Sequence, residues 1–183
     1  HGLTIGELAR FFALGLEAEP ELDVVWMDGW RREMQFQETG LPWVMPSPNM
    51  PTLDTALVYP GGCLLEGTML SEGRGTTRPF EIFGAPYVDS TQLAECLTQW
   101  NFPGVRFRPM HFEPTFHKHA GKVCGGVQVH VTDPRTFHSV TVYSAAIAAI
   151  REVWPEDFSW KQPPYEYETE KLPIDILAGG DSW

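Results

Sequence analysis

The sequence predicts a compact α+β (mixed α/β) domain with a mixed sheet and flanking helices. Two segments, 105–112 and 123–132, alternate between apolar and other residues as β-strands do. Other segments repeat apolar residues at helical spacing behind a capping residue. Because these elements follow no strict βαβ order, the pattern does not indicate a doubly wound parallel fold.

The N-terminal segment predicts a helix followed by a short strand. Thr4 and Glu7 have the spacing of a capping box. The apolar residues behind them share one helical face, and the helix is expected to end near Glu17, before Pro20. The apolar run 22–27 predicts a buried strand.

The middle of the chain predicts an ordered connection that leads into a polar stretch. Residues 40–52 contain four prolines, at 42, 46, 48 and 51, which exclude regular helix or central strand. Thr52 is expected to cap a helix through Val58, which Pro60-Gly61-Gly62 ends. The apolar run 63–66 then delivers Glu66 to the polar stretch.

The second half of the chain predicts further strands and helices. Residues 80–83 resemble a strand, Ser90 is placed to cap a helix through about Trp100, and 137–154 contain an amphipathic helix that Pro155 stops. In that helical segment, residues 140–142 also favour strand. Residues 174–177 begin a last element.

The polar stretch 64–81 is the strongest candidate for a ligand site. It holds Glu66 and Glu72, then Arg74 between two glycines, then Arg78, with four hydroxyl side chains among them. Acids, donors and a backbone free to turn are what a polar ligand needs. The alternative is a solvated surface loop.

Four segments of the sequence carry a resemblance to a known family. Residues 40–52 contain SPNMPT, 64–77 read LLEGT…SEGRGTT, and 56–61 and 83–89 flank them. Together they resemble the exo-β-N-acetylmuramidase family, glycosidases that remove terminal N-acetylmuramic acid from cell-wall fragments. The resemblance runs from residues 1–9 to 121–133 and beyond. Met69 stands where the family pattern is expected to have Asn, so one polar contact to sugar is in doubt.

The resemblance implies a larger two-domain protein. Residues 1–183 would form a single domain, the C-terminal half, with a Rossmann-like N-terminal half preceding it and the site in the cleft between them. This chain alone would then show little or no activity. The implied partners are a muramic acid-containing saccharide or muropeptide and the chain's own N-terminal domain, and the implied location is extracytoplasmic, periplasmic or secreted, in a bacterium.

Bulk properties restrict the partners. The net charge of −11 argues against nucleic acid and against an anionic membrane surface. No apolar run is long enough to predict a membrane span. Because wall fragments are acidic, a local basic patch must overcome the overall charge, and the candidates are Arg74, Arg78, Arg106 and Arg108.

Glycoside hydrolysis usually needs two carboxyl groups. Glu66 and Glu72 are the catalytic candidates, and both are expected to face one cleft open to solvent. Glu66 follows an apolar piece, which favours the acid role, while Arg74 beside Glu72 favours the ionised form. Retaining, inverting and substrate-assisted mechanisms all stay open. The alternative is that either glutamate pairs with Arg74 only to shape the loop; the weaker candidates are Glu81, Asp54 and Asp89.

Substrate-binding candidates lie in and around the same stretch. The Arg74 guanidinium fits the lactyl carboxylate of muramic acid in a bidentate manner. Asn49 offers an amide to sugar hydroxyls, Tyr59 a ring to a sugar face, and Thr76 a hydroxyl. His1 would sit beside the interdomain hinge.

Two other functions are considered. One is a non-catalytic substrate-binding or lid domain for cell-wall sugars. The other is a metal-dependent hydrolase, but the histidines show no established metal-ligand spacing, so neither a metal nor another cofactor is expected. The histidines in question are His111, His117, His119 and His130.

Overall fold

The computed structural model describes residues 2–18 and 20–180 and forms two compact units that divide between Pro42 and Trp43. The first unit contains α1 (Ile5–Ala13) and the 3-10 helix η1 (Phe36–Thr39). The elements of the second unit are α2 (Leu53–Gly62), the 3-10 helix η2 (Cys63–Gly67), β1 (Ile82–Ala85), α3 (Ser90–Gln99), β2 (Val105–Phe112), β3 (Cys124–Val131), α4 (Ser139–Val153) and α5 (Pro173–Ala178). The mixture of helices and a sheet confirms the predicted α+β class.

The first unit confirms the helix cap and contradicts the predicted strand. Thr4 and Glu7 form both halves of the capping box, and Arg32 donates to Glu7 at 2.6 Å. The helix α1 ends at Ala13, four residues before the predicted end at Glu17. Residues 22–27 are irregular, because a strand needs a pairing partner and the described residues of this unit supply none.

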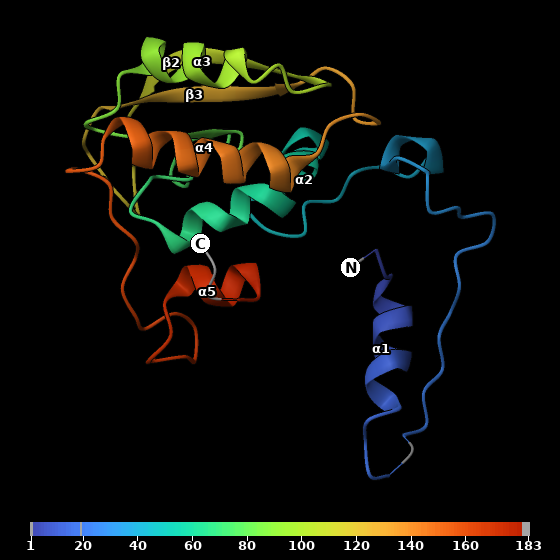
Figure 1. The fold of residues 1–183 in the computed structure, drawn as a ribbon. Coiled ribbons are helices and arrows are strands. Elements are labelled where there is room, and N and C mark those ends of the chain that lie inside the picture. Colours follow the sequence, from blue (N-terminus) through green and yellow to red (C-terminus); the bar gives the residue numbers. More distant parts are fainter. Residues whose placement is uncertain (1, 19, 181–183) are drawn as a thin grey trace. The chain divides into compact units, whose positions relative to one another are not determined.

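The sheet of the second unit has three strands in the order β1-β3-β2 (Figure 1). Both pairings are antiparallel, with Val105 opposite Val131 and Ile82 opposite Gln128. The prediction of a mixed sheet is therefore wrong for the described strands, because both pairings are antiparallel. A parallel pair needs a long crossover connection between neighbouring strands, and β2 and β3 are joined directly by a loop. The strand limits match the predicted 105–112 and 123–132 to within one residue.

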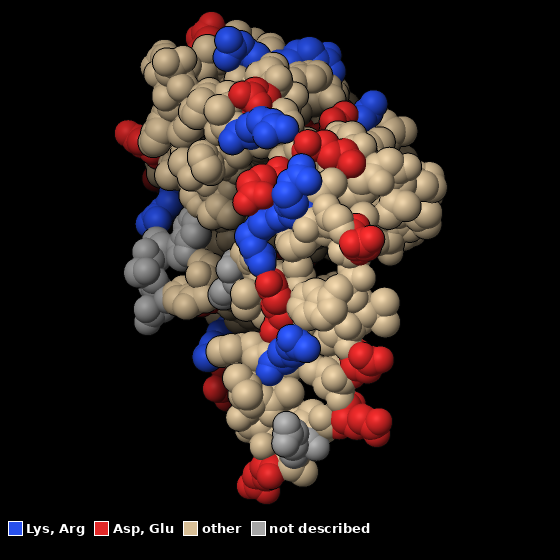
Figure 2. All heavy atoms as spheres, turned by 90° about the vertical axis from the view of Figure 1, so that its right-hand side faces the viewer, with Lys and Arg blue, Asp and Glu red and all other residues tan. Residues whose placement is uncertain are grey.

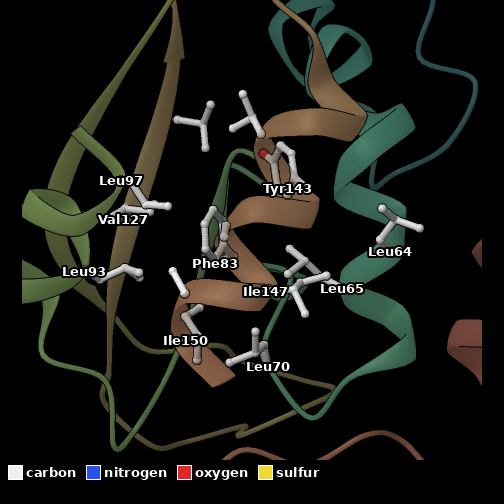
Figure 3. Close-up of a cluster of buried hydrophobic side chains, with 14 of the residues drawn as sticks. Leu64, Leu65, Leu70, Phe83, Leu93, Leu97, Val127, Tyr143, Ile147 and Ile150 are labelled. Atoms are coloured by element: carbon white, nitrogen blue, oxygen red, sulfur yellow. The ribbon is translucent and has the colours of Figure 1, made fainter. Parts of the chain in front are cut away.

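The core lies around α4, between the sheet and α2. Figure 3 shows side chains from the strands and α3 on one side of α4, and side chains from η2 on the other. Leu93 and Leu97 of α3 are buried there, as their helical spacing predicts. The ring of Tyr143 lies 5.4 Å from that of Phe83, and its hydroxyl donates to the Phe80 carbonyl at 2.5 Å. This core fixes one side of the polar stretch.

The helix α2 continues past the predicted stop at Pro60. Ser139 at the start of α4 supports the backbone on both sides of the proline: its Oγ accepts from the Gly61 amide at 2.8 Å and donates to the Val58 carbonyl at 2.5 Å. A Cβ on Gly61 would lie 2.2 Å from the Ser139 carbonyl oxygen. Glycine is therefore required for the two helices to approach, and α2 leads directly into η2 and Glu66.

The remaining helix ends differ from the predictions by small shifts. Asp89, and not Ser90, caps α3, because its carboxylate accepts from the Gln92 amide at 2.8 Å. The segment 140–142, which also favoured strand, is helical within α4. The predicted last element is α5. None of the described helices has the length and apolar character needed to cross a bilayer.

Candidate functional site

The polar stretch is an ordered and largely buried loop, which contradicts the solvated-loop alternative. Thr68 at the end of η2 donates to the Leu65 carbonyl and accepts from the Leu70 amide, so the loop starts with a tight turn. Gly73 and Gly75 have φ angles of 75° and 81°, which glycine adopts without strain. A Cβ on Gly73 would lie 2.5 Å from the Ile82 carbonyl oxygen. The loop therefore folds back against β1 and turns Arg74 inward.

Arg74 joins the two predicted catalytic glutamates. Its Nη2 donates to Glu66 Oε1 at 2.8 Å, and its Nε lies 3.1 Å from Glu72 Oε1. The guanidinium carbon lies 5.0 Å from the centre of the Phe80 ring, which supports it from one side. Both ion pairs considered as the loop-shaping alternative are present in the structure.

Glu72 is fully enclosed by basic side chains. Its side chain is 0% exposed, and Lys118 donates to Oε2 at 2.9 Å. The other oxygen, Oε1, lies 3.1 Å from both Arg74 Nε and His117 Nδ1, yet neither contact has the angle of a hydrogen bond. The prediction that both glutamates face a cleft open to solvent is therefore wrong for Glu72, because its side chain is fully buried among Arg74, His117 and Lys118.

A second loop, residues 113–123 between β2 and β3, supplies the basic side chains. Lys118 also donates to the carbonyls of Leu65 and Leu70, so its ammonium uses three acceptors. His119 Nε2 lies 2.7 Å from the Met69 carbonyl oxygen. Since these contacts reach both η2 and the polar stretch, the 113–123 loop holds Glu66 and Glu72 in one arrangement.

Glu66 lies at the outer side of this cluster. Its side chain is 15% exposed, and Oε2 accepts from the Tyr165 hydroxyl at 2.9 Å while Oε1 accepts from Arg74. Both oxygens thus accept hydrogen bonds from the protein, and the predicted acid role for Glu66 stays a prediction. Tyr59 is 37% exposed beside it and packs edge-on against Phe80.

The charges of the cluster shift the pKa values of its members. Partial burial by itself would lower the pKa of Arg74, but the hydrogen bond and charge of Glu66, with Glu72, raise it above its ordinary value. Burial lowers the pKa of Lys118, and Glu72 opposes that shift only in part. Burial, followed by the hydrogen bond to Glu66, raises the pKa of Tyr165, which keeps its phenol a donor.

The structure brings Glu66, Glu72, Arg74 and Tyr59 together, whereas Asn49 and Thr76 make their hydrogen bonds elsewhere. Thr76 closes the loop by donating to the Gly73 carbonyl at 2.6 Å. Asn49 lies half-buried in a turn where its backbone N–H donates to the Ser47 hydroxyl at 3.2 Å, and the described residues give it no hydrogen bond to the cluster. His1 lies outside the described residues, so its predicted role stays untested.

Two of the weaker carboxylate candidates have structural partners, and the third lies exposed at a helix N-terminus. Glu81 is buried and accepts from Thr55 at 2.6 Å and from Arg78 at 3.4 Å. Asp89 caps α3, and Asp54 is exposed in the first turn of α2. These roles explain the three carboxylates without catalysis.

The predicted basic patch is not formed by the four arginines. Arg78 pairs with Glu81, while Arg106 and Arg108 lie on β2 and donate to the Val105 carbonyl and to Gln128. Figure 2 shows acidic and basic side chains interspersed on the face it presents. The cations at the cluster are Arg74 and Lys118, so the local charge comes from a residue that the sequence did not single out.

The histidines do not converge on one point. Across the described ranges, no three His, Cys, Asp or Glu side chains are grouped closely enough to hold a metal ion. His111 and His130 lie on strands opposite Gly125 and Arg106. His117 and His119 instead contact the polar stretch, which gives them roles in the glutamate cluster.

Sequence reasoning missed three members of the site. Lys118 and Tyr165 lie 46 and 99 positions from their glutamate partners, so no local pattern joins them. His117 was weighed only as a metal ligand. The sequence signal for these residues was the run His117-Lys118-His119 between two predicted strands. Three consecutive polar side chains in a connecting loop can contact residues of a neighbouring loop.

The fold and the site together define a class of protein. It is an α+β domain in which Arg74 links a partly exposed glutamate to a buried glutamate that also pairs with Lys118. Two family models match the chain. The C-terminal model of the exo-β-N-acetylmuramidase NamZ matches residues 57–183, and the N-terminal model matches residues 1–54. The chain belongs to the exo-β-N-acetylmuramidase NamZ family, as the sequence motifs indicated.

Two relatives give the family detail. The chain is 50% identical over 160 residues to the peptidoglycan β-N-acetylmuramidase NamZ of Bacillus subtilis (strain 168), covering 87% of this chain and 39% of the relative. A crystal structure of a DUF1343 family protein from Bacteroides fragilis NCTC 9343 is 34% identical with a TM-score of 0.78, over 84% of this chain and 41% of that one. The chain thus spans about two fifths of the length of each.

Proposed function

We propose that this chain is part of an exo-acting β-N-acetylmuramidase that removes terminal N-acetylmuramic acid from peptidoglycan fragments during cell-wall turnover. The observation that carries the proposal is the match of residues 57–183 to the family's C-terminal model, because that range contains the whole glutamate cluster. The active site would lie in a cleft with a Rossmann-like N-terminal half, and the protein would act outside the cytoplasm. The assignment of residues 1–183 to one domain stays a prediction.

Glu66 is the proposed carboxylate at the reacting centre. It is the more exposed of the two glutamates, and its Arg74 and Tyr165 contacts orient both oxygens. As base, as nucleophile or as the group that orients the substrate's own 2-acetamido oxygen, it acts as a carboxylate, so the same residue serves each mechanism left open. Glu72 is the positioning member of the predicted pair. Its buried oxygens hold Arg74, Lys118 and His117 in place.

The substrate contacts proposed from the sequence are kept here as parts of the same proposal. Arg74 uses Nε and Nη2 for the two glutamates, so the lactyl carboxylate would be bound through the remaining nitrogen, Nη1, and not by the bidentate contact that the sequence predicted. Tyr59, which is 37% exposed, offers its ring to a sugar face. Asn49, Thr76 and His1 stay candidates for contacts to sugar in the proposed cleft.

The second candidate is a substrate-binding or lid domain whose partner half carries all the chemistry. The observation that favours it is the pairing of Arg74 with both glutamates, which a purely structural loop would also show. The two candidates differ in whether a glutamate of this chain is needed for bond cleavage and not only for binding.

Hydrolysis of a chromogenic N-acetylmuramic acid glycoside tests the proposed function. The two-domain form, in which this chain follows the N-terminal half of its family, is expected to release the chromophore, and this chain alone to release little or none. No release by the two-domain form from any N-acetylmuramic acid glycoside would contradict the proposed activity. Rapid release by the 183-residue chain alone would instead contradict the interdomain site.

A further inference from the structure

His117 occupies an unusual position beside the buried glutamate. Its Nδ1 lies 3.1 Å from Glu72 Oε1, while 43% of its side chain is exposed. The imidazole therefore links an enclosed carboxylate to the surface of the site. The polar stretch contributes Glu72 and Arg74 to its surroundings, and its own loop contributes Lys118 and His119.

The buried carboxylate fixes which imidazole nitrogen carries the proton. Glu72 Oε1 is fully buried and lacks a hydrogen bond of good geometry among the described residues. A buried acceptor of this kind needs a donor, and a small rotation of the half-exposed ring supplies one from Nδ1–H. Nδ1 then serves Glu72, which leaves Nε2 as the nitrogen not used by that carboxylate.

The backbone around His117 is held in a conformation that side chains disfavour. His117 has φ of 70° and His119 has φ of 57°, in the left-handed region that non-glycine residues seldom adopt. The Lys118 ammonium between them, with its three acceptors, maintains that conformation. Such strain persists where the surroundings determine it, and it is frequent at active sites.

His117 adds a titratable group to a cluster whose other charges cancel. Glu66 and Glu72 contribute two negative charges, and Arg74 and Lys118 contribute two positive charges, so the cluster without His117 is neutral. Protonation of His117 makes the cluster positive, in a chain whose net charge is −11. Glu72 stabilises that imidazolium as the carboxylate of a catalytic triad does.

We propose that His117 is the general acid of this site, a role that rests on the proposed glycosidase function. As the bond between C1 and the leaving oxygen breaks, its electron pair stays on that oxygen, and the proton moves there from Nε2 of the imidazolium. The other product forms when water supplies hydroxyl to C1, and Nε2 takes up the proton that this water releases. Nδ1–H stays on Glu72 throughout, so Glu72 positions the ring.

The test compares His117→Asn with His119→Asn in the two-domain form, because Asn tolerates the left-handed backbone at both positions. The two substrates are the 4-nitrophenyl glycoside of N-acetylmuramic acid, whose leaving group needs no proton, and a disaccharide of N-acetylmuramic acid and N-acetylglucosamine, whose leaving group does. For His117→Asn, kcat/KM on the disaccharide is expected to fall by about 10²–10⁴-fold and on the 4-nitrophenyl glycoside by far less. The alkaline limb of the pH profile is expected to disappear with the disaccharide.

The control separates chemistry from loop stability. His119→Asn removes the contact to the Met69 carbonyl but is expected to leave the ratio between the two substrates and the alkaline limb unchanged. Equal losses on both substrates in His117→Asn, or no loss on either, would overturn the acid role while leaving the proposed function intact. A wild-type protein that hydrolyses neither substrate would remove the proposed function, and the acid role with it.

Discussion

At the scale of single residues, the cluster is a set of opposite charges that depend on one another. Glu72 is 0% exposed and Lys118 is 7% exposed, so neither charge is screened by water as a surface pair is. Arg74 shares its guanidinium between two carboxylates. Removing any one of these charges therefore leaves the buried partners only partly compensated.

Lys118→Met is expected to destabilise the fold by about 3–5 kcal/mol, the usual cost of breaking a buried ion pair from one side. The methionine keeps most of the side-chain volume but leaves Glu72 Oε2 and the carbonyls of Leu65 and Leu70 without their donor. Urea unfolding followed by circular dichroism measures the change. Adding Glu72→Gln to this variant should recover part of the loss, and a Lys118→Met protein as stable as wild type would show that the ammonium does not hold the site.

Arg74→Lys in the two-domain form tests whether this guanidinium reads the acidic substituent. If it does, kcat/KM for N-acetylmuramic acid glycosides should fall about 10-fold or more beyond the fall for the N-acetylglucosamine equivalents, which lack the lactyl carboxylate. That factor corresponds to a charged hydrogen bond of about 1.5 kcal/mol. Equal losses on both glycosides would mean that Arg74 only shapes the loop through Glu66 and Glu72.

At the scale of elements, the site depends on how α4 is packed. The Tyr143 hydroxyl of α4 donates to the Phe80 carbonyl at the end of the polar stretch, and the ring is fully buried. Burial raises the pKa of this phenol well above its ordinary value, and the charge of Glu81 adds to the shift. The bond therefore ties the core to the loop that carries Glu72 and Arg74.

Tyr143→Phe should lower stability at neutral pH by about 1 kcal/mol, because the Phe80 carbonyl loses its donor. Below the unfolded-state pKa of about 10, the phenol is neutral in both states and contributes no pH dependence. Above it, the unfolded chain loses the proton and the folded chain keeps it, so wild type loses stability with rising pH more steeply than Tyr143→Phe. Urea unfolding of both proteins from pH 8 upward checks this, and parallel curves would contradict the shift.

Most elements were predictable because their signals are local. Neighbours within a few positions determine the helix caps, the strand alternation and the helical spacing. Examples are the caps at Thr4 and Thr52, the strands 105–112 and 123–132, and the pair Leu93 and Leu97. The run 22–27 failed as a strand because pairing is not local. The end of α2 was misplaced because Ser139, 81 positions away from Val58, bonds the backbone on both sides of Pro60.

The candidate site was predictable only in part, for the same reason. The stretch from Glu66 to Arg74 was found because its carboxylates, glycines and guanidinium are contiguous. Lys118, His117 and Tyr165 reach it from loops whose sequences give no sign of their partners. The burial of Glu72 follows from these distant cations, so it was not visible before the fold was known.

At the scale of the whole molecule, the proposed function rests on the family and on the greater length of its relatives. The chain covers 39% of the Bacillus subtilis relative, so the complete active site is proposed to include residues from the N-terminal half. What this chain contributes under the proposal is Glu66, held by Arg74 and Tyr165, and the Glu72 cluster beneath it. The central claim is that a glutamate of this chain takes part in breaking the glycosidic bond.

The measurement that tests this claim most directly is kcat/KM of Glu66→Gln in the two-domain form, with a disaccharide of N-acetylmuramic acid and N-acetylglucosamine as substrate. Gln keeps the size of the side chain and an acceptor for Arg74 or Tyr165, and circular dichroism verifies that the variant is folded. We expect kcat/KM to fall by about 10²–10⁴-fold, with most of the loss in kcat. A folded Glu66→Gln protein with wild-type kcat would contradict the claim and leave this chain the role of a binding or lid domain.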